Sequence, residues 1–273
     1  MDVGGSHVTA ALVQGDRVTA RADAELDPHG SAEHILGTIT DVGRKLGQHS
    51  RWTLAFPGPF DYERGIGTFE GVAKFGAIAG VDLTAELGAR LGARVGFVDD
   101  ADAYIMGEWA AGAARGHSRV IGVTLGTGVG AAFLVDGHPQ ADGPGVPPGG
   151  NLYPESYLGG PIEDTVSTRA LLASYGHRGM SVREVFERAR MGEASAAAVV
   201  GSTMEHLGRF VAPFIEHFGA TAFVVGGSIS QSWDLIEPAL RRGLGDTHVA
   251  IARSELLDDA PLLGAALVAI RRP

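Results

Sequence analysis

The sequence predicts an α/β protein with mixed sheets, built as two similar halves. Strand patterns alternate with helical patterns along most of the 273 residues. The 41 glycines gather at the ends of apolar runs instead of forming a linker. A strand, a glycine turn and a second strand occur near the start and again at 120–135. Two such halves are expected to leave a cleft between them, which is a usual place for a ligand.

In the first half, apolar spacing predicts two strands around a turn at Gln14-Gly15-Asp16, followed by helices that alternate with short buried strands. The expected strands are Val8–Val13, Arg17–Ala22, Thr53–Phe56 and Val95–Val98, and the expected helices are His34–Gly47, Leu83–Leu91 and Ala101–Ala114.

The second half repeats a strand pair and then becomes mainly helical. Strands are expected at Val120–Leu125, Ala131–Val135, Ala222–Val225 and 248–252, and helices at about 163–175, 181–190, 194–218, 232–243 and 261–271. The segment 137–162 is rich in Gly and Pro and is expected to be a loop.

Composition excludes several classes of protein. The net charge of −10 argues against a nucleic-acid or acidic-membrane partner, because phosphate backbones require a basic face. The chain has no cysteine, which excludes disulfides, thiolate nucleophiles and thiolate-held zinc. The longest uncharged apolar run, Val120–Val135, is too short and too rich in glycine to span a membrane. Residues 1–20 lack the pattern of a signal peptide, so we expect a cytoplasmic protein.

Two glycine turns are candidates for binding phosphate. In Asp2-Val3-Gly4-Gly5-Ser6, glycines let backbone N–H groups approach a phosphate, and Asp2 would be placed to reach a phosphate-bound Mg²⁺. Leu125-Gly126-Thr127-Gly128-Val129-Gly130 is a similar turn about 120 residues later. Each turn alone is also compatible with a plain or bulged hairpin. The chain has neither a G-x-x-x-x-G-K-[ST] nor a G-x-G-x-x-G motif.

Two further segments combine a buried strand with polar or flexible residues at its end. Asp99, Asp100 and Asp102 follow the strand at 95–98, and one Asp there can be a helix N-cap. Three carboxylates exceed what a cap needs, and one of them is suited to accept a proton from a substrate hydroxyl. Gly226 and Gly227 follow the strand at 222–225, either as a tight connection or as a surface for an adenine ring.

These motifs resemble the ROK family of sugar kinases, which is similar to bacterial glucokinases. The motifs DVGGS, Pro57-Gly58-Pro59, DDADA with Gly107-Glu108, LGTGVG, VVGGSIS and a terminal DAPLLGAA occur in the family's order from end to end. The resemblance implies an actin-like, RNase H-like two-domain ATPase fold with an interdomain cleft. It implies a smaller domain of residues 1–100 plus 261–273 and a larger one of 101–260.

The resemblance also implies roles for individual residues. Asp100 matches the catalytic base, Asp2 lies near the Mg²⁺, and the implied reaction is transfer of a phosphoryl group from Mg·ATP to a hydroxyl of a sugar or cyclitol. The phosphate turns are Gly4, Gly5, Ser6 and Gly126, Thr127, Gly128, and the adenosine turn is Gly226, Gly227.

The substrate side departs from the family pattern. Asp99 stands where the family has Asn, which can donate a hydrogen bond, whereas Asp only accepts one. The family's cysteine-rich zinc motif is absent, so we expect no zinc and a sugar loop ordered by prolines and packing. Glu163 matches a sugar-contacting Glu of the family; the alternative is that it is only a carboxylate in the first turn of a helix, where a negative charge is favourable. Asn151 and Glu155 lie nearest the positions of the family's Glu-x-x-His element.

Competing functions remain at this stage. Some ROK relatives are repressors with a basic helix-turn-helix segment ahead of the DxGG motif. Only Met1 precedes Asp2 in this sequence, so we expect an enzyme. Whether Met1 is the natural start is left open. A sugar- or nucleotide-binding protein without turnover is the main alternative. We expect a homodimer, and we consider Phe69 and Phe75 as candidates to line the sugar side.

Overall fold

The computed structural model describes residues 1–176 and 179–271 and consists of two compact units. The first contains Met1–Ala111 and the chain from Asp258 onward, and the second contains Gly112–Leu257. These limits differ from the expected boundaries after Asp100 and before 261. The helix that begins at Asp100 packs along the C-terminal helix, so the whole of it lies in the first unit.

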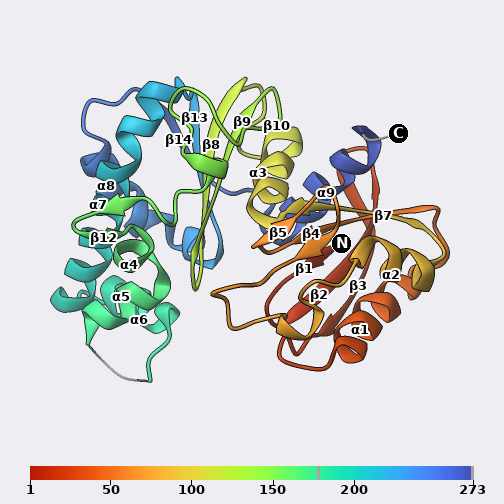
Figure 1. Cartoon of the computed structure of the whole chain (residues 1–273). Coiled ribbons are helices and arrows are strands. Elements are labelled where there is room, and N and C mark those ends of the chain that lie inside the picture. Colours follow the sequence, from red (N-terminus) through yellow and green to blue (C-terminus); the bar gives the residue numbers. More distant parts are fainter. Residues whose placement is uncertain (177–178, 272–273) are drawn as a thin grey trace. The chain divides into compact units, whose positions relative to one another are not determined.

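The first unit is built on a five-stranded mixed sheet in the order β3-β2-β1-β4-β7 (Figure 1). The central strand β1 pairs antiparallel with β2 and parallel with β4, and β4 pairs parallel with β7. The strands are β1 (Asp2–Val3), β2 (His7–Gln14), β3 (Arg17–Glu25), β4 (Arg51–Phe56) and β7 (Arg94–Asp99), with a small separate hairpin of β5 (Phe60–Asp61) and β6 (Ile66–Gly67).

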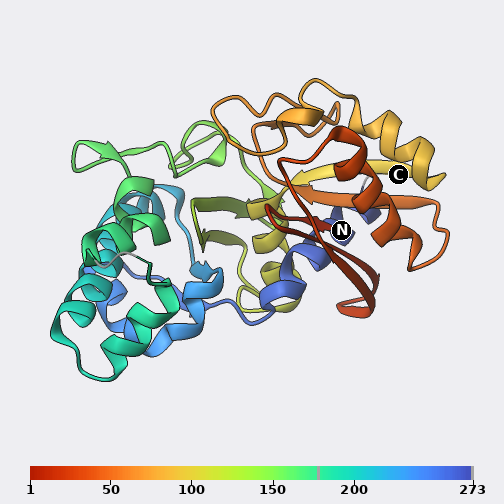
Figure 2. The ribbon, with the colours of Figure 1, turned by 90° about the horizontal axis from the view of Figure 1, so that it is seen from below.

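Helices cover both faces of this sheet. Alternate residues of β4 (Trp52, Leu54 and Phe56) join the buried cluster made with α1 (Ala32–Arg44) and α2 (Leu83–Leu91). The helices α3 (Asp100–Ala111) and α9 (Ala260–Arg271) lie on the opposite face (Figure 2). This period of two along the strand is what places one layer of helices on each face. Short 3₁₀ turns stand at Gly76–Ile78 and Leu257–Asp259.

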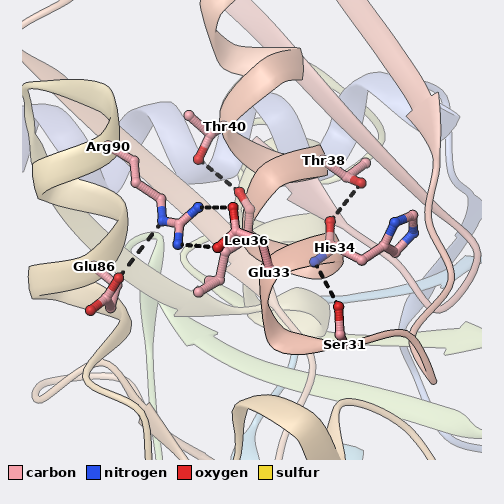
Figure 3. A network of polar contacts seen from close by, with 8 residues as sticks. All are labelled: Ser31, Glu33, His34, Leu36, Thr38, Thr40, Glu86 and Arg90. Atoms are coloured by element: carbon pink, nitrogen blue, oxygen red, sulfur yellow. Dashed lines mark hydrogen bonds and ion pairs between the residues drawn. The ribbon is translucent and has the colours of Figure 1, made fainter.

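Polar contacts tie α1 to α2 at the surface (Figure 3). The Arg90 guanidinium donates two hydrogen bonds to the Glu33 carboxylate, at 2.9 and 2.7 Å, and lies 3.7 Å from Glu86. The Ser31 hydroxyl caps α1 by accepting a hydrogen bond from the His34 N–H at 3.2 Å. Such a cap supplies a partner for one of the N–H groups that a helix leaves unpaired at its start.

Glycines allow the close approach of α3 to α9. A Cβ at Gly107 would overlap the Ala260 carbonyl, and a Cβ at Gly264 would overlap the Ala103 carbonyl. Because both obstacles are backbone atoms, neither can move aside without moving a helix. This contact fixes α3, and hence the aspartates at its start, against the C-terminal helix.

The second unit repeats the sheet plan of the first, in the order β10-β9-β8-β13-β14. β8 pairs antiparallel with β9 and parallel with β13, as β1 pairs with β2 and β4. The strands are β8 (Arg119–Leu125), β9 (Val129–Val135), β10 (His138–Pro139), β13 (Ala222–Gly226) and β14 (Ala250–Arg253). The repeat suggested by the two strand-turn-strand segments is therefore present in the topology.

The helices of the second unit pack around the long helix α7 (Ala194–Phe218), which contributes residues from Ala196 to Phe218 to the core. The others are α4 (Glu163–Val166), α5 (Thr168–Tyr175), α6 (Val182–Arg190) and α8 (Trp233–Leu244), with 3₁₀ turns at Pro148–Gly150 and Ser228–Ser232. The single helix expected over 163–175 is broken at Ser167, whose hydroxyl caps α5 by accepting from the Ala170 N–H at 3.2 Å. The other expected strands and helices are confirmed, with small shifts at their ends.

No helix within residues 1–176 and 179–271 has the length and apolar character needed to cross a bilayer.

Candidate functional site

The first glycine turn joins β1 to β2 at the centre of the first sheet. The Gly4 N–H donates to the His7 carbonyl at 2.9 Å and closes the turn, and the Ser6 carbonyl accepts from the Leu26 N–H at 2.9 Å. Both glycines are close to other side chains, because a Cβ at Gly4 would lie 3.0 Å from His7 Cε1 and one at Gly5 would overlap Lys74. Ser6 is exposed. The turn therefore presents backbone and one hydroxyl at the surface.

Asp2 lies at the base of this turn beside a basic partner. Its Oδ2 atom is 3.9 Å from His7 Nε2. Burial raises the pKa of the Asp2 carboxyl, against the charge of His7, which lowers it. No group of three or more His, Asp or Glu in the described part of the chain is arranged to hold a metal ion. This donor set suits Mg²⁺ that arrives on phosphates and needs only one or two carboxylates from the protein.

The aspartates that follow β7 divide into different roles. Asp99 is the N-cap of α3, since its Oδ1 accepts from the Ala101 N–H at 3.0 Å and from the Asp102 N–H at 3.2 Å. Its Oδ2 accepts a hydrogen bond from the Tyr62 hydroxyl at 2.8 Å. The cap considered for this segment is therefore Asp99, and both of its oxygens already have protein partners.

Asp100 begins α3 and keeps an exposed side chain. Partial desolvation by the surrounding protein, followed by the negative charges of Asp99 and Asp2, raises the pKa of Asp100 to about 7, against the Ala101 N–H and the charge of Lys74, which lower it. Burial and the charges of Asp99 and Asp100 hold the pKa of Asp102 well above its usual range. A carboxyl that titrates near neutral pH, and that solvent can reach, is suited to exchange a proton with a substrate.

Sequence reasoning missed Tyr62. It follows Pro57-Gly58-Pro59, and its hydroxyl lies 3.1 Å from the Phe56 carbonyl as well as 2.8 Å from Asp99. Nothing in its spacing marks it, because the contact joins β4, the hairpin and β7 only through the fold. Phe69 and Phe75, considered for the sugar side, are buried in the core with Phe56 and Phe97.

The second glycine turn, Gly126-Thr127-Gly128, joins β8 to β9 in the second unit. The Gly126 N–H donates to the Gly128 carbonyl at 3.0 Å, and the Gly126 carbonyl accepts from the Thr168 N–H at 2.9 Å. Thr127 is exposed at the tip. The turn repeats the position of the first one, since each follows the central strand of its sheet.

Glu163, an expected sugar contact, lies against this turn. Its Oε2 accepts from the Val129 N–H at 3.1 Å and would be 2.7 Å from a Cβ at Gly128, and its Oε1 is 3.7 Å from Arg169. The carboxylate therefore occupies an N–H of the turn that an anion would otherwise use. A phosphate and this carboxylate repel each other at that position, so one N–H cannot serve both.

Asn151 and Glu155 are part of a loop that has hydrogen bonds and apolar contacts of its own. The Asn151 amide donates to the Gly149 carbonyl at 3.1 Å, and the Glu155 carbonyl accepts from the Ile162 N–H at 2.8 Å. Buried Leu152 and Ile162 anchor a hairpin of β11 (Ser156–Tyr157) and β12 (Gly160–Pro161). The Tyr157 hydroxyl lies 3.0 Å from Nδ1 of His206 on α7. Apolar anchors and this polar contact connect the loop to the core.

The third glycine turn follows β13 at the same sheet edge as the second, since β13 runs parallel to β8 with Gly226 beside Thr124. Gly227 has φ 80° and ψ 175°, a conformation that only glycine adopts readily. A Cβ there would overlap the Leu125 carbonyl, and the Ser230 hydroxyl donates to the Gly227 carbonyl at 2.7 Å. The structure therefore requires glycine at 227, independently of any ligand.

Comparison with known proteins gives one consistent result. The model of the ROK family matches residues 1–272. The chain is 29% identical to the glucokinase of Thermotoga maritima, over 98% of this chain and 95% of that protein. It is 23% identical to an N-acetylmannosamine kinase of Haemophilus influenzae, over 97% of this chain and 93% of the relative.

A solved structure shows the same fold. The ROK family glucokinase from Streptomyces griseus, in complex with glucose and AMPPNP, has a TM-score of 0.79 at 23% identity and covers 99% of this chain and 98% of its own. This likeness confirms the actin-like, RNase H-like α/β fold that the resemblance implied.

Proposed function

Because the chain belongs to the ROK family, we propose that it is an ATP-dependent sugar kinase, which transfers the terminal phosphoryl group of ATP to a hydroxyl of a sugar or sugar-like polyol. The relatives named above as glucokinase and N-acetylmannosamine kinase support this class of reaction. The observation that carries the proposal is Asp100: an exposed carboxylate at the start of α3, directly after β7, that the helix does not use as its cap.

In this proposal Asp100 is the general base. It takes the proton of the acceptor hydroxyl, the hydroxyl oxygen forms a bond to phosphorus, and the bond from phosphorus to the bridging oxygen of ADP breaks. The transition state of such a transfer is loose, so the protein contributes mainly by placing the reactants and neutralising charge. Asp99 and Tyr62 act as positioning residues, because their hydrogen bonds fix the start of α3 and thereby the place of Asp100.

The glycine turns would hold the nucleotide. We assign the phosphates to Gly4, Gly5 and Ser6 and to Gly126, Thr127 and Gly128, and the adenosine to Gly226 and Gly227. Mg²⁺, when bound with ATP, would neutralise phosphate charge, and Asp2 is the residue that would hold it. Glycine lets the backbone approach phosphate closely.

The acceptor would be bound by the loop at 151–163. Its polar groups are Asn151, Glu155 and Glu163, and Glu163 lies beside the second phosphate turn. Asp99 can bind the acceptor only with those carboxylate lone pairs that its hydrogen bonds from Tyr62, Ala101 and Asp102 do not use. Glucose, N-acylated hexosamines and cyclitols all fit this description. The homodimer and the cytoplasmic location remain predictions.

An acceptor screen tests the proposal. Glucose, mannose, N-acetylmannosamine, N-acetylglucosamine and inositols are each incubated with the protein, ATP and Mg²⁺, and ADP release is measured against the Asp100→Asn variant. We expect at least one acceptor to stimulate ADP release that the variant lacks. ATP and sugar that raise the melting temperature, with no acceptor consuming ATP, would instead favour a binding protein without turnover.

A further inference from the structure

Lys74 places its ammonium group on the first glycine turn. Its Nζ, Cε and Cδ atoms all lie where a side chain of Gly5 would be, with Cε 3.0 Å and Cδ 3.2 Å from the position of a Cβ. The contact is possible because residue 5 is glycine. The lysine comes from the segment between Phe69 and Phe75, which is about 70 residues away in the sequence, so no local pattern predicts it.

The backbone that presents Lys74 is held in an unfavourable conformation. Phe75 has φ 63° and ψ 11°, and Phe69 has φ 51°, both in the left-handed region that non-glycine residues avoid. Such a conformation is energetically unfavourable for a residue with a side chain. Both rings are buried, and the Phe75 N–H donates to the Pro28 carbonyl at 2.8 Å, so packing holds them there. Strain of this kind is found preferentially at functional sites.

The carboxylates of Glu25 and Asp27 line the same recess as Lys74, yet the lysine forms no ion pair with a described residue. Its charge lowers the pKa of Asp100. Within the described residues no carboxylate lies close enough to Nζ to count as an ion pair, and the side chain is exposed. A recess of about 960 Å³, lined by Gly5, Ser6 and Lys74 together with residues of the segment 25–34, opens beside it.

We propose that Lys74, whose ammonium group lies on the first glycine turn, contacts the phosphoryl group during its transfer. The inference rests on the proposed kinase function and adds a residue to it. The three equatorial oxygens of the transferred group carry the charge of a loose transition state, and a fixed ammonium stabilises that charge. Removing one such preorganised group from an active site typically lowers kcat by about 10²–10³-fold.

The test compares Lys74→Met and Lys74→Arg with Lys45→Met. Methionine removes the charge and keeps most of the stem, arginine keeps the charge, and Lys45 is the chain's only other lysine. Lys45 is exposed at the end of α1, where it donates to the Asp23 carbonyl at 3.2 Å. We expect kcat to fall by about 10²–10³-fold in Lys74→Met, with little change in the KM for the acceptor. Part of the rate should return in Lys74→Arg, and none should be lost in Lys45→Met.

A binding measurement separates a phosphate contact from a merely structural role. The rise in melting temperature with Mg·ATP should shrink in Lys74→Met, whereas the rise with AMP, which lacks the terminal phosphates, should be unchanged. If the unaltered protein consumes ATP with an acceptor and Lys74→Met keeps its rate and its response to Mg·ATP, the lysine inference fails alone. If the unaltered protein neither binds ATP nor phosphorylates any acceptor, the proposed function fails and the inference fails with it.

Discussion

Replacing Asp100 with asparagine removes the proposed proton acceptor while keeping the size of the side chain. Asp100 is not the cap of α3, so the hydrogen bonds from Ala101 and Asp102 to Asp99 should survive. General base catalysis by a placed side chain contributes about 10²–10⁴-fold, and kcat should fall by that factor. In the unaltered protein kcat/KM should rise with pH through about 7, because the carboxyl must lose its proton before it can act as a base.

The same substitution should stabilise the fold. Desolvation and the charges of Asp99 and Asp2 raise the pKa of Asp100 above its value in the unfolded chain, so its ionised form destabilises the native state. Above pH 7 the variant should therefore melt at a higher temperature than the unaltered protein. The difference should shrink as the pH falls through 7, where the native carboxyl binds its proton, and should vanish below the unfolded pKa near 4.

Steady-state kinetics with the acceptor found in the screen and thermal unfolding between pH 6 and 9 measure both effects. Asp102→Asn is the control, because it removes a neighbouring carboxylate without removing the proposed base, and it should keep kcat within a few-fold. Asp99→Asn should fold, since asparagine is also a good N-cap. Turnover of Asp100→Asn at close to the parent rate would refute the assignment. A lower melting temperature at pH 8 would refute the account of the charges.

Three further predictions concern the glycines and the metal. Gly264→Ala should lower the free energy of unfolding by about 1–2 kcal/mol, which urea unfolding measures. The overlap of the new Cβ with the backbone of α3 outweighs the gain in helix propensity of about 1 kcal/mol. Gly227→Ala should both destabilise the second unit, by about 1–3 kcal/mol from its backbone angles alone, and weaken ATP binding in a titration. EDTA should stop turnover without changing the melting temperature, and Mg²⁺ should restore turnover. Stoichiometric zinc in the purified protein would contradict the expected absence of a zinc site.

The strands, the helices and the repeated plan of the two halves were predictable because they depend on the order of apolar residues and glycines within short stretches of the sequence. Apolar spacing placed the ends of β7 and of α3 to within a few residues. The break at Ser167 was missed because Ser fits a helix interior poorly but not impossibly, and its capping hydrogen bond is visible only in the structure. The short strands β11 and β12 depend on contacts with the core, which the Gly-rich composition of the loop does not reveal.

The candidate site was predictable only where a motif brings its residues together in sequence. The glycine turns and the aspartates after β7 are of this kind. Tyr62, Lys74 and the contact of Glu163 with the second turn join segments that lie tens of residues apart, so only the fold shows them. The division of roles between Asp99 and Asp100 was also hidden, because either carboxylate can cap a helix and the choice depends on which one faces the first N–H groups of α3.

The first unit contains several energetically unfavourable features, namely carboxyl groups with raised pKa values and a strained backbone segment. Their presence in the same unit is itself an argument for function. Asp2, Asp99, Asp100 and Asp102 all have raised pKa values. Phe75, whose backbone angles are strained, directly follows Lys74, and the charge of Lys74 lowers the pKa of Asp100. A fold selected for stability alone would replace one of the aspartates, since that change gains free energy without touching the core. Both features fit the proposed phosphoryl transfer, in which a base with a pKa near the working pH accepts the proton and positive groups neutralise the charge of the phosphoryl group.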